Sequence, residues 1–349
     1  RKILTLLRFR AISGARTRPS KIAQEERMQR LMSSLASMIA AAAFAGNAAA
    51  QTTLRFAHTQ PTADTHHAAA LHFKERVEEL TDGQVKVSVH PAGELGNDPA
   101  VLEGVRLGTI DVGITGNPFF TRFEPRLNAL DLPYLFNGYE HAYRVIDGPI
   151  GEALIKGLEK HRMQPLAFWE IGFRNITNSR RAVRTPKDLE GLKIRTTPNP
   201  AHVEAFKIMG AMPFTEVYLA LESGTVDGQE NPLSIIHSNR FHEVQKHLSM
   251  TQHAYTVSIL VMSQQKWRSL SEDHQKAVLE AARDAQRLQR ELNQKANKKA
   301  LEEIRAAGVE VIEEIDTEPF RNAVLEPVKG IYVKEHGSEV VDQIIAAGR

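Results

Sequence analysis

Cysteine is absent from the 349-residue sequence, and aromatic side chains are few, with 2 Trp and 6 Tyr. The lack of cysteine excludes a disulfide scaffold, a thiol nucleophile and a cysteine-ligated zinc site. Four motifs are also missing: the GxSxG elbow of serine hydrolases, the phosphate-binding P-loop, the GxGxxG dinucleotide fingerprint and the HExxH zinc motif. We therefore expect neither catalysis nor a cofactor.

Charge is spread unevenly along the chain. Residues 1–50 carry nine Lys and Arg against two acids, whereas residues 51–349 carry 35 basic and 40 acidic residues, a formal net charge of −5. Nucleic-acid-binding domains carry concentrated positive charge, which the larger part lacks. We expect no nucleic-acid partner, and a basic arm at residues 1–27 is the alternative interpretation.

The segment from Met28 to Ala50 has the layout of a secretory signal peptide. Arg30 precedes an apolar stretch at 35–45, and the segment ends in three alanines, which form a small-residue cleavage site. A transmembrane anchor is the alternative, but the stretch is short for about 30 Å of hydrocarbon. We expect Met28 to be the natural start, cleavage to follow Ala50, and the mature protein, residues 51–349, to be periplasmic.

Strand and helix patterns alternate along residues 51–349. Apolar–polar alternation predicts strands, apolar residues every three or four positions predict helices, and Gly or Pro marks the breaks. The alternation indicates an α/β fold in two similar halves, which the chain is long enough to form. Strands are predicted at 53–58, 84–90, 110–115, 164–170 and 193–196, helices at 65–80, 102–107, 201–209 and 216–223, and a turn into a further strand at 224–228.

A long helix is expected from Ser271 to Ala307, a stretch that contains neither Gly nor Pro. Ser271 is a suitable N-cap, and the two acids that follow it favour a helix start. About 35 residues rise about 50 Å, which exceeds the size of one small lobe. The helix should lie across two lobes or kink between them, and such a link suggests a hinged binding cleft.

Histidines gather near the start of the mature chain, at His58, His66, His67 and His72. His67 and His72 are five residues apart, which places them poorly for two ligands on one helical face. We expect no metal site here, and solvent-exposed or supporting histidines instead. Metal ligation is the alternative.

Two arginines occupy positions that require an explanation. Arg174 follows a predicted strand and a glycine, and Arg195 lies within an otherwise apolar strand. Arginine keeps its charge, so its burial requires an anion. The anion is either a ligand or a structural acid, and the residues alone leave both open. The structural candidates are Glu204, Glu216 and Glu222.

Asn231 stands between a glycine-rich turn and Pro232, where its amide can donate and accept hydrogen bonds. It is either a ligand-binding residue or an Asx-type turn residue. Asp227 and Glu230 beside it could form an acid–base pair, but turn and strand-edge roles are favoured.

These residues lie in segments that resemble the solute-binding subunits of TRAP (tripartite ATP-independent periplasmic) transporters, in the dicarboxylate- and sialic-acid-binding class. The resemblance covers residues 54–344. Its landmarks are HPAGELGND at 90–98, LDLPYLF at 130–136, GFRNITNSRRAVRTPKDLEGLKIR at 172–195 and EVYLALESGTVDGQENP at 216–232. The last two together are specific to this family.

The resemblance implies an α/β fold of two lobes with crossing connections, a long helix spanning both, and a ligand cleft between them. The expected lobes are 51–171 with 257–295, and 172–256 with 296–349. It implies that Arg195 forms a salt bridge with the ligand carboxylate, that Arg174 supports the same group or a second anion, and that Asn231 donates nearby. We also place His58 and Asp98 among the ligand-binding residues.

Some positions depart from the family pattern. Sialic-acid-binding members carry a Glu and an Arg just after the strand that ends here at Thr115, where this chain has the stretch 116–119, so sialic acid is not expected. Asn117 and Phe119 should make this wall neutral and partly apolar. The loop at 213–216 is shorter than usual, which bears on the neighbouring pocket wall. Trp169 and Tyr218 either stack on a ring or acyl chain or pack in the core.

The expected function is therefore capture of a small organic acid for delivery to the TRAP membrane subunits. A sugar acid or C4 dicarboxylate is favoured over an aromatic or branched-chain keto acid. The protein should act as a monomer. The alternatives are a binding module that feeds a sensor receptor and a periplasmic hydrolase or lyase.

Overall fold

The computed structural model describes Met28, Met32, residues 51–210 and residues 217–349. Apart from those two methionines, the expected signal peptide lies outside the described residues, as does the short loop at 213–216. Residues 51–349 form one unit of the structure. Within the described part, no helix is both long and apolar enough to cross a membrane.

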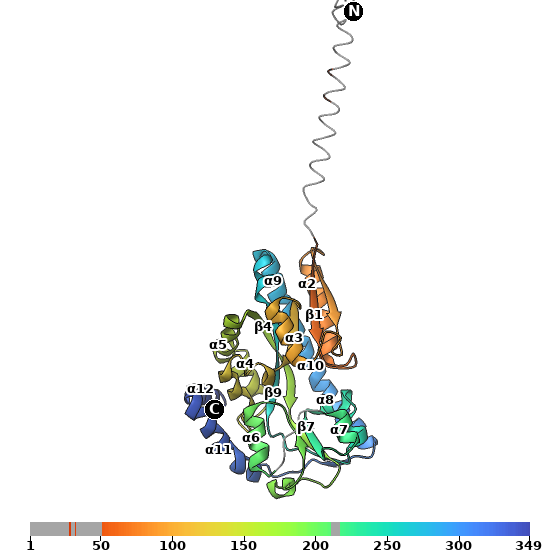
Figure 1. Ribbon diagram of the computed structural model, residues 1–349, viewed down its shortest axis with the longest axis vertical. Helices are drawn as coiled ribbons and strands as arrows, with labels where there is room; N and C mark the ends of the chain where they lie inside the picture. The colour runs from red at the N-terminus through yellow and green to blue at the C-terminus, as the bar shows by residue number, and fades with distance from the viewer. Residues whose placement is uncertain (1–27, 29–31, 33–50, 211–216) are drawn as a thin grey trace, which may run out of the picture. The chain divides into compact units, whose positions relative to one another are not determined.

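Two five-stranded sheets, one toward each end of this unit, organise the fold (Figure 1). The first sheet has the order β2-β1-β3-β9-β4. β1 is parallel to β2 and β3, whereas β9 is antiparallel to β3 and β4. Every residue of β9 is buried, because the strand lies inside the sheet with both faces covered. The bounds are β1 Thr52–His58, β2 Val85–His90, β3 Val112–Gly116, β4 Met163–Phe173 and β9 Tyr255–Ser263.

The second sheet has the order β10-β8-β5-β7-β6 and consists of short strands. Its central strand β5 is antiparallel to both β7 and β8. All residues of β5 and β7 are buried, although most are polar. Their polar side chains form hydrogen bonds with one another; for example, Gln229 Nε2 donates to Thr177 Oγ1 at 2.8 Å. The bounds are β5 Asn175–Asn178, β6 Ile194–Arg195, β7 Gly228–Asn231, β8 His247–Ser249 and β10 Glu310–Ile312.

The chain crosses between the sheets at two adjacent points. β4 continues through Arg174 into β5, and the segment after β8 leads through Ala254 into β9. Backbone hydrogen bonds join the two crossings: Arg174 N donates to Ala254 O at 2.8 Å, and His253 N donates to Arg174 O at 3.2 Å. The crossing connections predicted from the sequence are confirmed, and Arg174 lies at the crossing itself.

Helices cover the sheets where the sequence places N-caps. Asp64 accepts from His66 N at the start of α2, and Asn97 accepts from Ala100 N at the start of α3, which therefore begins four residues before the predicted helix. The α-helices before the second crossing are α2 Thr65–Leu80, α3 Asp98–Leu107, α4 Tyr139–Ile146, α5 Pro149–Lys156, α6 Pro200–Ile208, α7 Tyr218–Glu222 and α8 Leu233–Ser238. After it come α9 Gln264–Ser269, α10 Glu272–Ala306, α11 Glu318–His336 and α12 Glu339–Ala347.

α10 is the predicted long helix, capped by Ser271, and it contacts both ends of the unit in turn (Figure 1). Asp284 on α10 accepts from Arg76 of α2 at 2.9 Å. Further along, Asn297 accepts from the backbone N of Ser234 in α8 at 2.9 Å. The helix therefore ties α2, beside the first sheet, to α8, beside the second.

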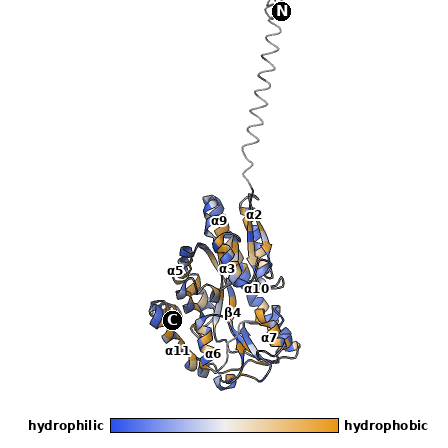
Figure 2. Ribbon diagram, in the orientation of Figure 1, coloured by the Kyte–Doolittle hydropathy of each residue, from blue (hydrophilic) through white to orange (hydrophobic). Residues whose placement is uncertain are grey.

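The buried apolar side chains of the described residues pack in three clusters. One cluster joins α2 and α10 to the first sheet, another surrounds α8 and the end of α10, and the third links α6 and α11 to a 3₁₀ helix at Pro125–Asp131. Figure 2 shows hydrophilic and hydrophobic stretches mixed along the helices at both ends. α11 packs on α6 and α12 on α4 and α5, so the C-terminal helices brace elements far apart in sequence.

Gln289 of α10 completes the edge of the first sheet. Its Oε1 accepts from Glu170 N and its Nε2 donates to Glu170 O, both at 2.8 Å, beside a bulge in β4. We expect Gln289→Leu to lower the free energy of unfolding by about 2–3 kcal/mol, because it leaves two buried backbone groups without partners. Urea denaturation of this variant and of Gln286→Leu, whose half-buried side chain donates only to the side chain of Asp147, measures the effect. Equal losses in the two variants would contradict the role assigned to Gln289.

Candidate functional site

A cavity of about 260 Å³ lies where the ends of strands from the two sheets meet. The residues after β1, the 3₁₀ turn after β3, and the crossing at Arg174 form one side, while β6, β7 and α8 form the other. Its polar lining consists of Thr59, Gln60, Asp98, Arg174, Arg195, Thr197, Asn231, Asn239 and Thr256. Its remaining lining consists of Gly116, Pro118, Phe119, Ile171, Val217, Ile235 and Phe241.

Arg195 ends the short edge strand β6 and presents its guanidinium to the cavity. Among the described residues no carboxylate lies within 4.0 Å of it, and its buried Nε makes no hydrogen bond. Burial lowers the pKa of Arg195 to about 10, so the side chain is still charged at neutral pH. A half-buried cation that faces a cavity and has no carboxylate partner among the described residues is a site for an anion.

Arg174 lines the same cavity but is already neutralised. Its Nε and Nη2 both donate to the Glu230 carboxylate, with Nη2 to Oε1 at 3.1 Å, and Nη2 also donates to Asn231 Oδ1 at 2.9 Å. Arg174 is 2% exposed and Glu230 is fully buried. The structural acid left open by the sequence is therefore Glu230 at Arg174. Of the acids suggested there, Glu204 pairs with Lys207 and Glu222 is exposed, so neither is its partner, and Glu216 lies outside the described residues.

Glu230 connects Arg174 to the second sheet. Burial alone would raise its pKa, but the charge of Arg174 and the hydrogen bond to His253 hold the pKa of Glu230 well below its usual range. His253 Nε2 lies 3.2 Å from Glu230 Oε2, and Thr196 Oγ1 donates to Oε1 at 2.8 Å. The carboxylate is thus charged and fully engaged, which fixes Arg174 in place.

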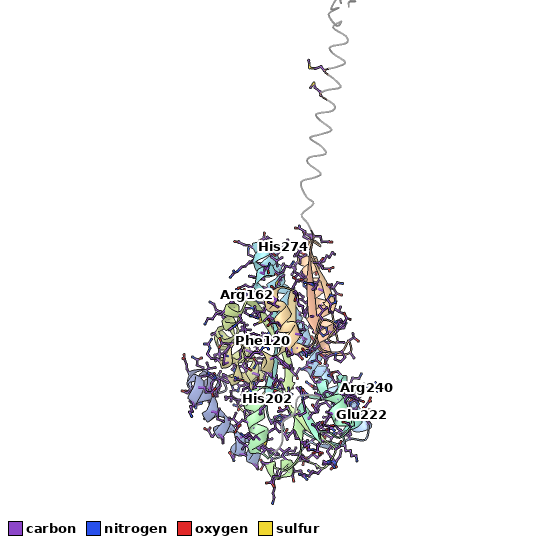
Figure 3. The ribbon with its side chains drawn as sticks, in the orientation of Figure 1. Phe120, Arg162, His202, Glu222, Arg240 and His274 are labelled. Atoms are coloured by element: carbon purple, nitrogen blue, oxygen red, sulfur yellow. The ribbon has the colours of Figure 1, made fainter. Side chains whose placement is uncertain are left out.

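The hydroxyl of Thr197 is positioned from behind the cavity wall. It lies 2.7 Å from Nδ1 of His202, a buried residue of α6 that Figure 3 labels. Burial lowers the pKa of His202 to about 3, so the imidazole is neutral at physiological pH. A neutral ring can accept from or donate to the hydroxyl without adding charge to the cavity.

Asp98 is the one acidic residue that the described part of the chain contributes to the cavity lining. It is the first residue of α3, and its Oδ1 accepts from Thr59 Oγ1 at 3.0 Å. Burial raises the pKa of Asp98, whereas Thr59 and the charge of Arg195 act in the opposite direction. Four of the expected residues thus line this one cavity: Arg195, Arg174, Asn231 and Asp98.

The other four expected residues do not line the cavity. Trp169 is fully buried in the core beside Phe56, so core packing, not ligand stacking, is its observed role. Asn117 is turned inward and donates to Asp131 at 2.7 Å, because its neighbours Gly116, Pro118 and Phe119 form the wall instead. His58 is buried with its Nε2 3.1 Å from His67, and Tyr218 packs with the cluster around α8. Trp169 and Asn117 therefore have core roles in this structure, whereas ligand binding by His58 and Tyr218 stays a prediction.

A buried serine, histidine and aspartate do come together elsewhere. Ser258 Oγ lies 2.9 Å from His66 Nε2, and His66 Nδ1 lies 2.8 Å from Asp64 Oδ1. The order is that of a hydrolase triad, but each of the three is at most 3% exposed and none lines the cavity. Asp64 Oδ2 instead accepts from Ser238 at 2.9 Å, so this series of hydrogen bonds links β9 and α2 to α8.

Asp131 lies behind the wall with two amides on one oxygen, from Asn117 at 2.7 Å and Asn199 at 2.8 Å. Burial raises the pKa of Asp131 to about 7, against an unfolded value near about 3.9. Between these values the folded protein binds a proton that the unfolded chain does not, so stability falls as pH rises from about 4 to about 7.

We therefore expect Asp131→Asn to raise the free energy of unfolding at pH 8 by on the order of 2 kcal/mol, and to change it little at pH 5. Urea denaturation at both pH values measures the difference. A variant that is equally destabilised at the two pH values would show that the carboxylate of Asp131 is charged throughout.

Several lining residues carried no sequence signal. Thr59, Gln60, Asn239 and Thr256 are ordinary polar residues at strand and helix ends, and only the assembled fold brings them to one cavity. Glu230 is 56 residues from Arg174, and no local spacing pairs them. A search for buried acids opposite each arginine would have needed the strand register.

Comparison with known proteins places this site in context. Residues 56–335 match the family described as bacterial extracellular solute-binding protein, family 7 (DctP). The chain is 41% identical over 298 residues to the 2,3-diketo-L-gulonate-binding periplasmic protein YiaO of Escherichia coli, covering 84% of this chain and 91% of that protein.

Two solved structures are similar over most of the chain. A TRAP periplasmic solute-binding protein from Polaromonas, bound to D-erythronate, has a TM-score of 0.82 and 36% identity, covering 84% of this chain and 98% of that one. The sugar acid binding protein DctPAm from Advenella mimigardefordensis, in complex with galactonate, has a TM-score of 0.81 and 33% identity, covering 85% and 97%.

Proposed function

This chain belongs to family 7 of the bacterial extracellular solute-binding proteins, and we propose that it captures a small sugar acid through Arg195 and releases it to TRAP membrane subunits. It is a TRAP-type solute-binding protein, and proteins of this type are periplasmic. The role that we propose is binding without chemical turnover.

The observation that carries the proposal is the contrast between two arginines in one cavity. Arg174 has a buried carboxylate partner in Glu230, whereas no carboxylate of the described residues pairs with Arg195. A guanidinium presents two parallel N–H donors that match the two oxygens of a carboxylate. We infer that the ligand carboxylate takes the place at Arg195 that Glu230 takes at Arg174.

The polarity of the cavity favours a hydroxylated acid. Amide or hydroxyl groups of Thr59, Gln60, Thr197, Asn239 and Thr256 line it, and each can donate to or accept from a hydroxyl. The similar proteins bind diketogulonate, erythronate and galactonate, which are acids of this kind. A sugar acid is therefore our proposal for the ligand class.

We propose that capture closes two lobes, formed by residues 51–171 with 257–295 and by residues 172–256 with 296–349. Two contacts would then join the lobes beside the ligand. Asp64 accepts from Ser238 at 2.9 Å, and Asn239 Nδ2 lies 3.4 Å from Gln60 Oε1. Because Gln60 and Asn239 also line the cavity, ligand binding and closure would use the same groups.

Binding energy of the expected size follows from few contacts. Hydrogen bonds to charged groups contribute about 1.5–3 kcal/mol each, and they strengthen when closure excludes water. Two such bonds at Arg195 with several neutral ones give about −8 kcal/mol, which corresponds to a dissociation constant near about 1 μM.

A thermal-shift screen of residues 51–349 tests the function. Protein freed of bound solute by unfolding and refolding is heated with aldonates, uronates, C4 dicarboxylates and keto acids. A true ligand at about 100 times its dissociation constant adds about 2.7 kcal/mol of stability, which raises Tm by several degrees. We expect aldonates or uronates to give the largest shift and to be recovered unchanged. No shift with any acid would contradict the proposed function.

A further inference from the structure

We propose that Asp98 makes the cavity selective for acids with a single carboxylate and a hydroxylated tail, and excludes dicarboxylates. This inference rests on the proposed capture of a carboxylate by Arg195. It goes further by assigning the opposite end of the ligand and by choosing between two acid classes that the family binds in common.

The charges around the cavity allow only one carboxylate. Arg174 and Glu230 cancel each other, so the described lining presents one free cation, Arg195, and one anion, Asp98. One ligand carboxylate neutralises Arg195 and leaves the negative charge of Asp98. A second carboxylate would add a further negative charge with no cation among the described lining residues to meet it, and buried uncompensated charge is costly.

Asp98 and Arg195 face the same space without touching. Each influences the other electrostatically, yet no nitrogen of Arg195 lies within 4.0 Å of an Asp98 oxygen. The space between this cation and this anion fits a ligand that has a carboxylate at one end and a hydrogen-bond donor at the other. A ligand bridging the two satisfies both charges, which direct contact does not do here.

The free oxygen of Asp98 determines what that second end can be. Oδ1 accepts from Thr59, whereas Oδ2 makes no hydrogen bond to the described residues. An ionised carboxylate only accepts hydrogen bonds, so it binds a hydroxyl and repels another carboxylate. The tail of the ligand therefore carries a hydroxyl where a dicarboxylate carries its second charge.

Two pairs of acids isolate this effect, because each pair differs only at the far carbon. Erythronate and meso-tartrate share four carbons, and galactonate and galactarate share six, with a terminal hydroxymethyl group in the first member and a carboxylate in the second. Calorimetry at pH 8, well above the ordinary pKa of about 3.9 for an aspartate, measures the four dissociation constants. We expect the better-bound aldonate to bind at least about 100-fold more tightly than its dicarboxylate.

Asp98→Asn is the diagnostic variant, because it removes the charge and keeps the size of the side chain. We expect it to reduce the preference for the aldonate over the dicarboxylate by at least about tenfold. Glu103→Gln is the matched control: it removes one negative charge from the same helix, at a half-exposed side chain outside the cavity. The control should keep the wild-type preference.

The outcomes separate the two proposals. If neither aldonates nor dicarboxylates bind the wild type, capture of a sugar acid fails and the role of Asp98 fails with it. If aldonates bind through Arg195 but the preference is unchanged in Asp98→Asn, capture stands and the role of Asp98 is refuted. A preference lost equally in Glu103→Gln would refute it too, because distance from the cavity would then not matter.

Discussion

Replacing Arg195 with Met is expected to weaken binding of a sugar acid by about 10²–10⁴-fold while leaving the ligand-free protein at least as stable as the wild type. The loss of affinity follows from removing two charged hydrogen bonds, each contributing about 1.5–3 kcal/mol. Stability is retained because no described acid pairs with the guanidinium, so the variant removes a half-buried charge that no described carboxylate neutralises. Calorimetry and urea denaturation measure the two effects separately.

The combination of the two results is the informative part. Replacing an ordinary structural arginine lowers the free energy of unfolding of the protein, whereas replacing Arg195 should not. Arg283→Met, at an exposed position of α10, controls for the loss of one positive charge and should change neither property. If Arg195→Met unfolds the protein, Arg195 has a structural anion as its partner, and the account of the cavity is wrong.

Glu230→Gln should cause the largest loss of stability, about 3–5 kcal/mol, because it leaves the buried guanidinium of Arg174 without its charge partner. The wild-type carboxylate has a lowered pKa, so its contribution is present above about pH 4.3 and is lost as pH falls further. The variant should therefore lose part of the wild-type acid sensitivity. Urea denaturation from about pH 3 to about pH 7 measures both the loss of stability and its dependence on pH.

A double variant separates charge from packing in this pair. Adding Arg174→Met to Glu230→Gln removes the orphaned charge, so the double variant should be more stable than Glu230→Gln alone. Arg240→Met breaks an exposed pair with Glu243 and should cost no more than about 1 kcal/mol. A loss of that same small size in Glu230→Gln would show that the buried pair contributes no more than an exposed one.

Much of the first sheet could be predicted, because its strands and helices carry clear periodicity. α2 spans Thr65–Leu80 as expected, and α10 begins after Ser271, where the cap residue and acids indicated it. The strand β9 was missed because its central run, Ile259–Met262, is continuously apolar, which is typical of a strand buried on both faces and gives no alternation. The second sheet was only partly predicted because β5 and β8 are short and β5 is largely polar.

The site residues could be predicted where the chemistry of a side chain requires a partner, and they were missed where only the direction of the side chain decides. A buried arginine demands an anion, which singled out Arg174 and Arg195, but their two partners could not be told apart until β5 and β7 were in register. Asn117 lies between the cavity-lining residues Gly116 and Pro118, and a strand or turn that shifts by one residue points its side chain the other way. Side-chain direction at strand ends is the information that one sequence lacks.

The central claim is that Arg195, and not Arg174, receives the ligand carboxylate. A crystal structure of residues 51–349 with the tightest-binding aldonate tests it most directly. The account predicts both carboxylate oxygens within hydrogen-bond distance of Arg195, a tail hydroxyl on Asp98, and Arg174 still bound to Glu230. A carboxylate bound by Arg174 with Glu230 displaced, or one placed outside the cavity, would contradict it.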